Sequence, residues 1–247
     1  MDKTLYLISR NSLLYCKEFS NSLSMNRLYS SFLRLRLAFF FVLSLWVPFL
    51  VQETYAAFTL DCATVVGIPP SECRILKSLY EYTSGHSWNN NANWWANSDP
   101  STWYGITLSG WHVSEIRLFQ NTLTLTLLPD FSFSWLTQLV TLDLGNNRIT
   151  GEIPQNLVSW MSTLQRLNIE GNLFTWNIPP WLFQGLTNLR YLYFENNGLS
   201  GEIPATLFSS LSRLENLSFW GNAFSGAIPE TLFSGLTSLR ELSFFEN

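Results

Sequence analysis

The chain has 247 residues, of which 47% are hydrophobic and 13% are charged, and its formal net charge is -4 at pH 7. This composition is too apolar for a disordered chain and ample for a folded core. Residues 57–247 carry eight basic and fifteen acidic side chains. A surface of that sign repels phosphate backbones, so the composition argues against nucleic acid as a partner.

The first 56 residues are predicted to be a leader that ends in a secretory signal peptide. An apolar run, LAFFFVLSLWVPFLV at 37–51, follows several arginines and precedes small residues, and this order is typical of a secretory signal. Cleavage is expected after Ala56. The run is short for a bilayer span and is broken by Pro48, so an uncleaved anchor is the less favoured alternative. Initiation at Met25 would give a signal of ordinary proportions.

Two cysteines lie beyond the leader, in the stretch CATVVGIPPSEC. In an oxidising compartment, Cys62 and Cys73 are close enough in sequence to favour one small disulfide over two free thiols. Together with His86 and His112 they offer too few neighbouring ligands for a metal site. We therefore expect no metal and no cofactor.

Residues 113–247 are predicted to form about six repeats with a period of 25 residues. Each repeat begins with a segment of the form LxxLxLxxN, such as LVTLDLGNN, and continues with a segment such as GLSGEIP. The leading apolar residues are Val113, Leu139, Leu164, Leu189, Leu214 and Leu239, and the asparagines are Asn121, Asn147, Asn172, Asn197, Asn222 and Asn247. A period of 20 to 29 residues with this motif is the leucine-rich-repeat signature.

The repeat pattern has a simple physical meaning. In xLxLx, alternation turns residues such as Leu142 and Leu144 inward and the residues between them outward. Each asparagine stands where the strand ends, and its amide can satisfy backbone groups in a buried corner. The predicted fold is an α/β, right-handed leucine-rich-repeat solenoid with a parallel sheet on its concave face and short 3-10 or irregular segments on its convex face.

The LxGxIP segments resemble those of an extracellular leucine-rich-repeat subclass known best from plant receptor ectodomains and found also in secreted bacterial and protist proteins. Residues 57–112, which include LKSLYEYTSGHSWNNNANWWANSDPSTWYGIT, look like the N-terminal cap of that subclass: a helix, a tryptophan-containing loop and a segment leading into the first strand. The family carries cysteines flanking the WYG segment. This chain has Ser101 and Leu108 there, so that disulfide cannot form.

The sequence stops at Asn247, the strand-ending position of its last repeat. The last coil of a solenoid exposes an apolar edge and an unpaired strand unless a terminal unit covers it. We therefore expect a fragment truncated at the C-terminus. Its continuation could be further repeats, a surface anchor or a signalling domain.

Four of the eleven tryptophans stand where glycine would suit the backbone. They are Trp111 in a tight turn, Trp135 and Trp160 at the position of Gly185 and Gly235, and Trp176 at the position of Gly151, Gly201 and Gly226. A large ring is a poor substitute where the chain needs glycine's conformational freedom. Either these positions are exposed and tolerant, or UGA codons that mean glycine in a recoded bacterial genome were translated as tryptophan.

The outward strand positions are predicted to form three columns on the concave face, and this face is the candidate ligand-binding site. Exposed aromatic residues among polar ones are typical of binding hot spots. The candidate residues are Tyr191, Tyr193, Trp220, Glu170, Glu195, Arg166, Asp143, Asn168 and Phe245. The alternative is that the aromatic rings only pack on one another across the strands. Acidic neighbours favour a cationic or hydroxyl-rich partner.

No nucleophile elbow, phosphate-binding glycine loop or HExxH motif is present, and an open curved sheet lacks the enclosed pocket that catalysis requires. We therefore expect a non-enzymatic protein, secreted or at the cell surface, that binds protein, peptide or carbohydrate through its concave face. The alternatives are a structural or adhesive surface scaffold and the truncated ectodomain of a receptor. Membrane attachment would require an uncleaved signal or a C-terminal anchor.

Overall fold

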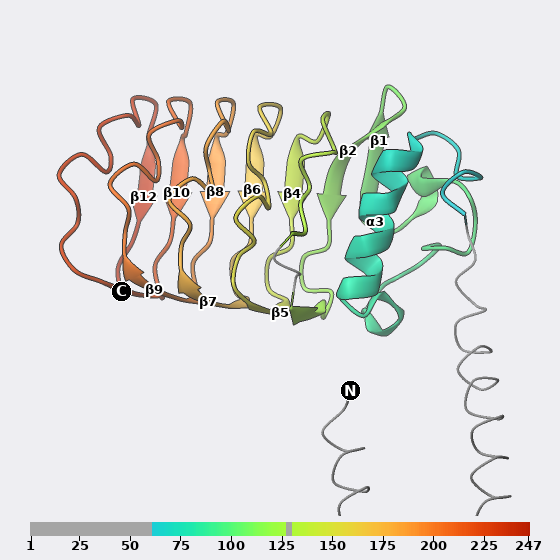
Figure 1. The fold of residues 1–247 in the computed structure, drawn as a ribbon, viewed down its shortest axis with the longest axis horizontal. Coiled ribbons are helices and arrows are strands. Elements are labelled where there is room, and N and C mark those ends of the chain that lie inside the picture. Colours follow the sequence, from blue (N-terminus) through green and yellow to red (C-terminus); the bar gives the residue numbers. More distant parts are fainter. Residues whose placement is uncertain (1–60, 127–129) are drawn as a thin grey trace, which may run out of the picture. The chain divides into compact units, whose positions relative to one another are not determined.

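A computed structural model describes residues 61–126 and 130–247 (Figure 1). They belong to one compact unit, Leu60–Asn247. The predicted leader and signal peptide, residues 1–56, lie outside the described residues. Within the described ranges, no helix combines the length and apolar character needed to cross a membrane.

The N-terminal part of this unit is built on helix α3, Pro70–Tyr82. Proline is well suited to the first helical position because its missing N–H would have no partner there. The helix buries Cys73, Leu76 and Leu79 along one face, the spacing of an amphipathic helix. Cys62 forms a disulfide with Cys73, with a Cα–Cα distance of 5.5 Å. This cross-link ties the segment before the helix to its first turn.

A cluster of aromatic rings packs beside α3. It lies around two short 3-10 turns, η2 (Gly85–Ser87) and η3 (Pro100–Thr102). The buried rings are Tyr80, Trp88, Trp94 and Trp103. The indole N–H of Trp88 donates to the carbonyl of Thr83 at 3.0 Å, and that of Trp94 to the carbonyl of Tyr104 at 2.9 Å. The polar edge of each ring is therefore satisfied while its apolar surface is buried.

Strand β1 (Ile106–Ser109) pairs antiparallel with β2 (His112–Arg117), the first strand of the repeats. The two residues of the connecting turn, Gly110 and Trp111, both have positive φ, 57° and 67°. Such a turn matches the twist of paired strands and strongly prefers glycine at its second position. The antiparallel partner β1 was not predicted separately from the sequence.

Glu72 on α3 connects the helix to this hairpin. Its side chain is only 2% exposed. One carboxylate oxygen lies 2.6 Å from His112 Nδ1, and the other accepts a hydrogen bond from the Val113 N–H at 2.8 Å. The carboxylate thus satisfies a backbone donor at the start of the repeat sheet.

Glu72→Ala is expected to lower the free energy of unfolding by about 2 kcal/mol, because it leaves the buried Val113 N–H without a partner. Urea unfolding followed by circular dichroism measures the change. The matched control is Glu81→Ala on the same helix. Glu81 is exposed and lies 3.8 Å from Lys77, in a surface ion pair, so its loss should change stability little. Equal effects of the two substitutions would contradict this role for Glu72.

The main sheet contains seven strands in the order β1-β2-β4-β6-β8-β10-β12, and all pairs after β1–β2 are parallel. The additional strands are β4 (Thr141–Asp143), β6 (Arg166–Asn168), β8 (Tyr191–Tyr193), β10 (Asn216–Ser218) and β12 (Glu241–Ser243). From β4 to β12, each residue pairs with the one 25 positions later. The predicted repeat and solenoid are confirmed.

A second sheet, which the sequence did not predict, has five strands in the order β11-β9-β7-β5-β3. They are β3 (Thr124–Thr126), β5 (Arg148–Gly151), β7 (Leu173–Asn177), β9 (Gly198–Glu202) and β11 (Ala223–Ser225). The strands follow the asparagines and lie along the lower edge of the unit in Figure 1. Stacking of equivalent coils brings neighbouring backbones close enough to pair.

The core lies between these strands and the returning turns. Leu142, Leu167 and Leu192 are fully buried, as the alternation predicts. In the C-terminal coils, phenylalanine takes the inward position that Leu144 and Ile169 hold in earlier coils. Phe194 and Phe219 stack with ring centroids 5.5 Å apart, and Phe219 and Phe244 with centroids 5.8 Å apart. Because each coil buries its apolar edge against the next, the stack behaves as a quasi-one-dimensional core.

The strand-ending asparagines form a ladder inside the coils, as predicted. Asn147 Oδ1 accepts from the N–H groups of Asn121 and Leu123 in the preceding coil, at 2.9 and 3.0 Å. Its amide donates to the carbonyls of Leu118 and Leu144, both at 2.8 Å. Equivalent bonds occur at Asn172, Asn197 and Asn222. One side chain therefore satisfies backbone groups of two successive coils.

The four tryptophans in glycine positions are all strongly exposed, between 64% and 78%. Three of them, Trp111, Trp160 and Trp176, hold positive φ values of 67°, 66° and 75°. Gly151, at the position equivalent to Trp176, has φ 88°. Exposure explains how the rings are tolerated, and the φ values show that the backbone there has the conformation that glycine adopts most easily.

Replacing Trp111 or Trp176 with glycine is expected to raise the free energy of unfolding by about 1 kcal/mol each, because the left-handed conformation is strained for any residue with a Cβ. Thermal unfolding followed by circular dichroism measures the gain. Trp135→Gly is the matched control, since Trp135 is 68% exposed but is not among the residues with positive φ. A gain of the same size at Trp135 would contradict the backbone explanation.

Candidate ligand-binding face

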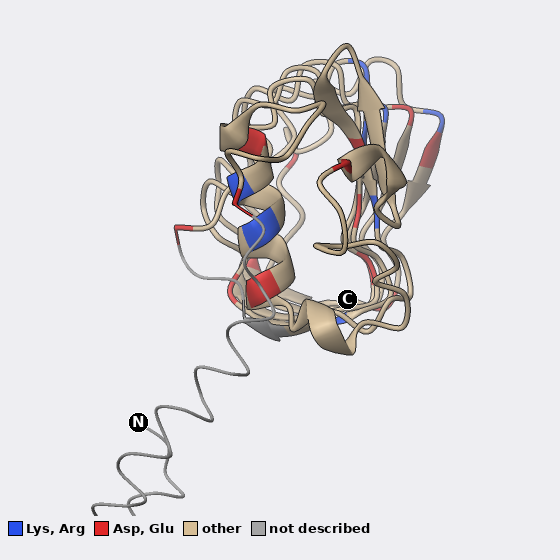
Figure 2. Cartoon of the chain, turned by 90° about the vertical axis from the view of Figure 1, so that its right-hand side faces the viewer, with Lys and Arg blue, Asp and Glu red and all other residues tan. Residues whose placement is uncertain are grey.

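The outward side chains of the main sheet form the predicted columns. We call this surface the sheet face; it consists of the outward residues of β2, β4, β6, β8, β10 and β12 and of the residue that follows each strand by two. Tyr191 pairs with Arg166 on one side and Asn216 on the other. Tyr193 likewise lies between Asn168 and Ser218. Figure 2 looks along the stack of coils, with the strands on one side and α3 on the other.

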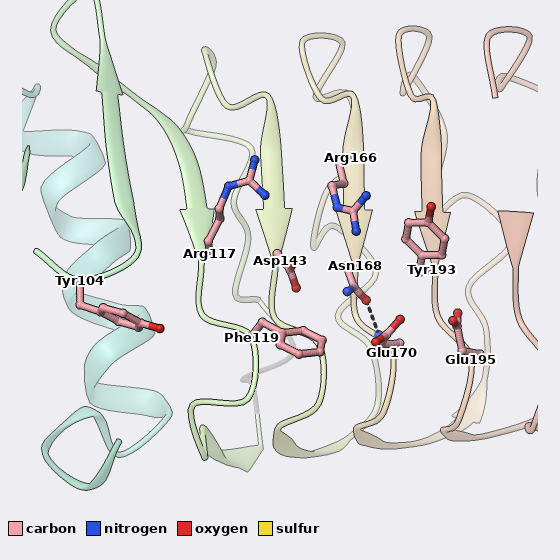
Figure 3. A pocket seen from close by; sticks show the side chains of 9 residues that line it. All are labelled: Tyr104, Arg117, Phe119, Asp143, Arg166, Asn168, Glu170, Tyr193 and Glu195. Atoms are coloured by element: carbon pink, nitrogen blue, oxygen red, sulfur yellow. Dashed lines mark hydrogen bonds between the residues drawn. The ribbon is translucent and has the colours of Figure 1, made fainter. Parts of the chain in front are cut away.

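A pocket of about 590 Å³ lies on the sheet face (Figure 3). Its lining residues come from β2, β4, β6 and β8, the turns that follow these strands and the segment before β1. They are Tyr104, Arg117, Phe119, Asp143, Arg166, Asn168, Glu170, Tyr193 and Glu195. Six of these are among the nine predicted site residues. The pocket is therefore made mainly from the predicted columns.

The other three lining residues, Tyr104, Arg117 and Phe119, were not predicted as site residues. Arg117 and Phe119 occupy outward positions on and just after β2, so the repeat register alone places them on the face. Tyr104 precedes β1, in the part of the chain that has no repeat register. No sequence signal placed its ring at the pocket, because that depends on how the segment before β1 folds back on the sheet.

Three predicted residues, Tyr191, Trp220 and Phe245, lie outside the pocket lining. Trp220 and Phe245 stack on one another in adjacent coils, with ring centroids 5.1 Å apart and planes at 8°. This is the packing across strands that the alternative interpretation predicted. Tyr191 lies beside Arg166, whose guanidinium carbon is 5.8 Å from the ring centroid.

Arg166 is the central cation of the pocket. Its guanidinium carbon lies 4.9 Å from the centroid of the Tyr193 ring, a favourable cation–π distance. Its Nε atom is buried and has no hydrogen-bond partner among the described residues. The positive charge of Arg166 also acts on Asp143, although burial dominates there and raises the pKa of the Asp143 carboxyl above its ordinary value.

Two glutamates form the acidic end of the pocket. Glu170 Oε1 accepts a hydrogen bond from Asn146 Nδ2 at 2.8 Å, and the Glu170 N–H donates to Asn168 Oδ1 at 2.9 Å. Glu195, in the next coil, is only 8% exposed. Burial, together with the negative charge of Glu170, raises the pKa of Glu195 to about 7. Its Oε2 atom is buried and has no hydrogen-bond partner in the described part of the chain.

The other end of the pocket carries an ion pair. Arg117 Nε lies 2.9 Å from Glu115 Oε2 on the same strand, and the hydrogen bond from Arg117 lowers the pKa of Glu115. Over residues 61–126 and 130–247, no group of three or more histidine, cysteine, aspartate or glutamate side chains is placed to hold a metal ion. The residues that line the pocket present charges of both signs and aromatic rings, which are the groups that make charge-assisted and aromatic contacts.

Two protein-family models match the repeat region of the chain. A model described as "Leucine rich repeat" matches residues 162–224, and a second, "Leucine Rich Repeat", matches residues 138–160. Among curated proteins, the LRR receptor-like serine/threonine-protein kinase GHR1 of Arabidopsis thaliana is 41% identical over 73 residues. That alignment covers 29% of this chain and 7% of the kinase, so the chain spans a small part of the relative that it matches.

Solved structures show the same architecture over most of the described residues. The LRR ectodomain of the receptor kinase SOBIR1 from Arabidopsis thaliana is 27% identical with a TM-score of 0.57, over 73% of this chain and 94% of that one. The ectodomain of the Arabidopsis receptor kinase HAESA, solved in complex with an IDA peptide hormone ligand, is 28% identical with a TM-score of 0.61, over 71% of this chain and 29% of that one. The repeat motif, the strand register and these likenesses together make the described part of the chain a leucine-rich-repeat solenoid, similar in architecture to the ectodomains of plant receptor kinases.

Proposed function

We propose that the chain is the ligand-binding module of an exported or cell-surface protein, and that it binds a peptide or a segment of a protein on the sheet face. The observation that carries this proposal is the pocket itself. It presents two buried polar atoms, Arg166 Nε and Glu195 Oε2, that have no hydrogen-bond partner in the described part of the chain. A buried polar atom without a partner is unfavourable, and a ligand seated in the pocket could supply one.

Two further points support a peptide over other ligands. The HAESA ectodomain, which shares this architecture, was solved with a peptide hormone bound. The pocket also joins aromatic rings to charged groups of both signs, a combination that suits peptide side chains and backbone amides. Tyr191, Trp220 and Phe245 remain predicted contacts for a ligand long enough to extend past the pocket. The similarity to GHR1 covers 7% of that kinase, so no kinase activity is proposed.

The test compares two multiple variants on arrays of synthetic peptides and glycans. The pocket variant replaces Tyr104, Phe119 and Tyr193 with alanine. These rings are partly exposed, so the fold should survive, and circular dichroism checks that it does. The matched face variant replaces Trp220 and Phe245, which stack outside the pocket.

We expect the chain to retain a set of peptides, and the pocket variant to bind them at least tenfold more weakly, since aromatic anchors carry much of the binding energy at such sites. The face variant should lose less affinity for these peptides. If only glycans are retained, or if the pocket variant binds as well as the unaltered chain, the pocket is not a peptide site. A scaffold function would then be favoured.

A further inference from the structure

The acidic end of the pocket combines Glu170, whose carboxylate is held by a hydrogen bond, with Glu195, which has one carboxylate oxygen, Oε2, without a donor among the described residues. Glu170 and Glu195 follow β6 and β8, two adjacent coils, and both line the pocket (Figure 3). The hydrogen bond from Asn146 holds Glu170 in place. Glu195 is more than nine-tenths buried, yet its Oε2 is left without a partner in the described residues. A buried carboxylate oxygen that borders a pocket and lacks a donor favours a ligand that brings one.

The charges around the pair favour a cationic donor. The outward positions of the sheet face carry five acidic residues and two basic ones, namely Glu115, Asp143, Glu170, Glu195, Glu241, Arg117 and Arg166. Arg117 is already paired with Glu115. Arg166 lies over the ring of Tyr193. Among the described residues, no lysine or arginine forms an ion pair with Glu170 or Glu195.

We propose that Glu170 and Glu195 form a subsite for the guanidinium or ammonium group of a basic side chain in a peptide ligand. This inference rests on the proposed function, since it takes the pocket as the place where the peptide binds. A guanidinium presents several N–H donors in a fixed plane and can bridge carboxylate oxygens. The rings of Phe119 and Tyr193, which line the same pocket, give the apolar stem of such a side chain a surface to pack on.

Binding at this subsite depends on pH. Glu170, after β6, is the charged group that acts on Glu195 directly. Arg166 on β6, Asp143 on β4 and Tyr193 on β8 line the same pocket, and Glu241 on β12 acts on Tyr193, as Glu195 does. The pKa of Glu195 is about 7. Above that pH Glu195 is ionised and its charge adds to the attraction for a cation, and below it Glu195 is neutral. The affinity for a basic side chain should therefore fall about tenfold between about pH 8 and about pH 5.5.

The probe is the blocked tripeptide acetyl-Gly-Arg-Gly-amide, which carries one guanidinium and no other charge. Binding to the chain is followed by nuclear magnetic resonance of the glutamate side-chain carboxyl carbons. At about pH 8 the resonances of Glu170 and Glu195 should shift at millimolar probe, and Glu195→Gln should weaken binding about tenfold. The matched control is Glu152→Gln, an exposed residue just after β5, which should leave binding unchanged.

Three results would overturn the inference: no shift of these resonances with the arginine tripeptide, an equal response to acetyl-Gly-Gln-Gly-amide, or unchanged binding by Glu195→Gln. These outcomes are separable from failure of the proposed function. Array peptides that depend on Tyr104, Phe119 and Tyr193 but lack basic residues would sustain a peptide site and exclude a cation subsite. If the chain binds the arginine tripeptide but retains no array peptide, the proposed function is excluded and the cation subsite is not.

Discussion

Asn147→Ala is expected to lower the free energy of unfolding by about 3 kcal/mol or more. The side chain is 7% exposed, and it accepts two backbone hydrogen bonds and donates to three carbonyls. Alanine removes all of these contacts and leaves buried groups of two coils unpaired, at about 1–3 kcal/mol for each group left unsatisfied. Urea unfolding followed by circular dichroism measures the loss.

Two comparisons sharpen this result. Asn222→Ala should have a smaller effect, because Asn222 is only half-buried and its hydrogen bond to the Leu199 N–H is longer, at 3.3 Å. Asn156→Ala is the control, since Asn156 is exposed on the returning part of the coil. If Asn147→Ala unfolds at the same urea concentration as Asn156→Ala, the asparagine ladder does not stabilise the solenoid.

Glu195→Gln is expected to stabilise the fold at about pH 8, by about 3 kcal/mol, and to have little effect at about pH 4. Glutamine resembles the protonated carboxyl and carries no charge to bury. At high pH the ionised Glu195 side chain is held in a buried position beside Glu170, which is unfavourable, and the substitution removes that repulsion. Thermal unfolding across this pH range measures the difference.

The sign follows from the direction of the pKa shift. Folding raises the pKa of Glu195 from an ordinary value of 4.5 to about 7, so the folded chain holds this proton more tightly than the unfolded chain. The resulting stabilisation is complete below about pH 4.5 and is lost as the pH rises through about 7. Glu152→Gln, at an exposed position, is the control. A stability difference for Glu195→Gln that does not change with pH would show that Glu195 keeps an ordinary pKa in the folded chain.

The same buried carboxylate that destabilises the ionised fold is the one assigned to ligand binding. A binding site often keeps groups that the free protein would be more stable without. A basic ligand would compensate the charge of Glu195 and restore part of that stability, since any molecule that binds only the folded state stabilises it. Stability and the proposed ligand binding at this pocket would therefore be coupled through one ionisable group.

The repeat architecture could be predicted in detail because it depends on patterns that are local in the sequence. Alternation within a strand separates Leu142 from its outward neighbours, and the 25-residue spacing places equivalent residues side by side. Both patterns require only that successive coils stack. The register of Tyr191 with Arg166 and the ladder through Asn147 follow from that one condition, and the structure shows both.

The tryptophans show where a local pattern is ambiguous. Comparing repeats marked Trp160 and Trp176 as occupants of glycine positions, and the structure adds that both have positive φ while their rings are exposed. The second sheet is a feature for which the sequence has no local pattern at all. Its strands, such as β7 and β9, form because neighbouring coils bring extended backbones into hydrogen-bonding range. The pattern of apolar and polar residues within one repeat does not predict this pairing.

The sequence by itself determined the period, the inward and outward positions and the residues that share a column, because these depend on spacing along one chain. Only the tertiary structure decided which outward residues surround a pocket, that Tyr104 joins them, and that Glu195 is buried beside Glu170. Burial and pKa depend on the distances between side chains from different coils and on the solvent excluded between them. Those quantities arise only when the coils are stacked and the segment before β1 is folded against them.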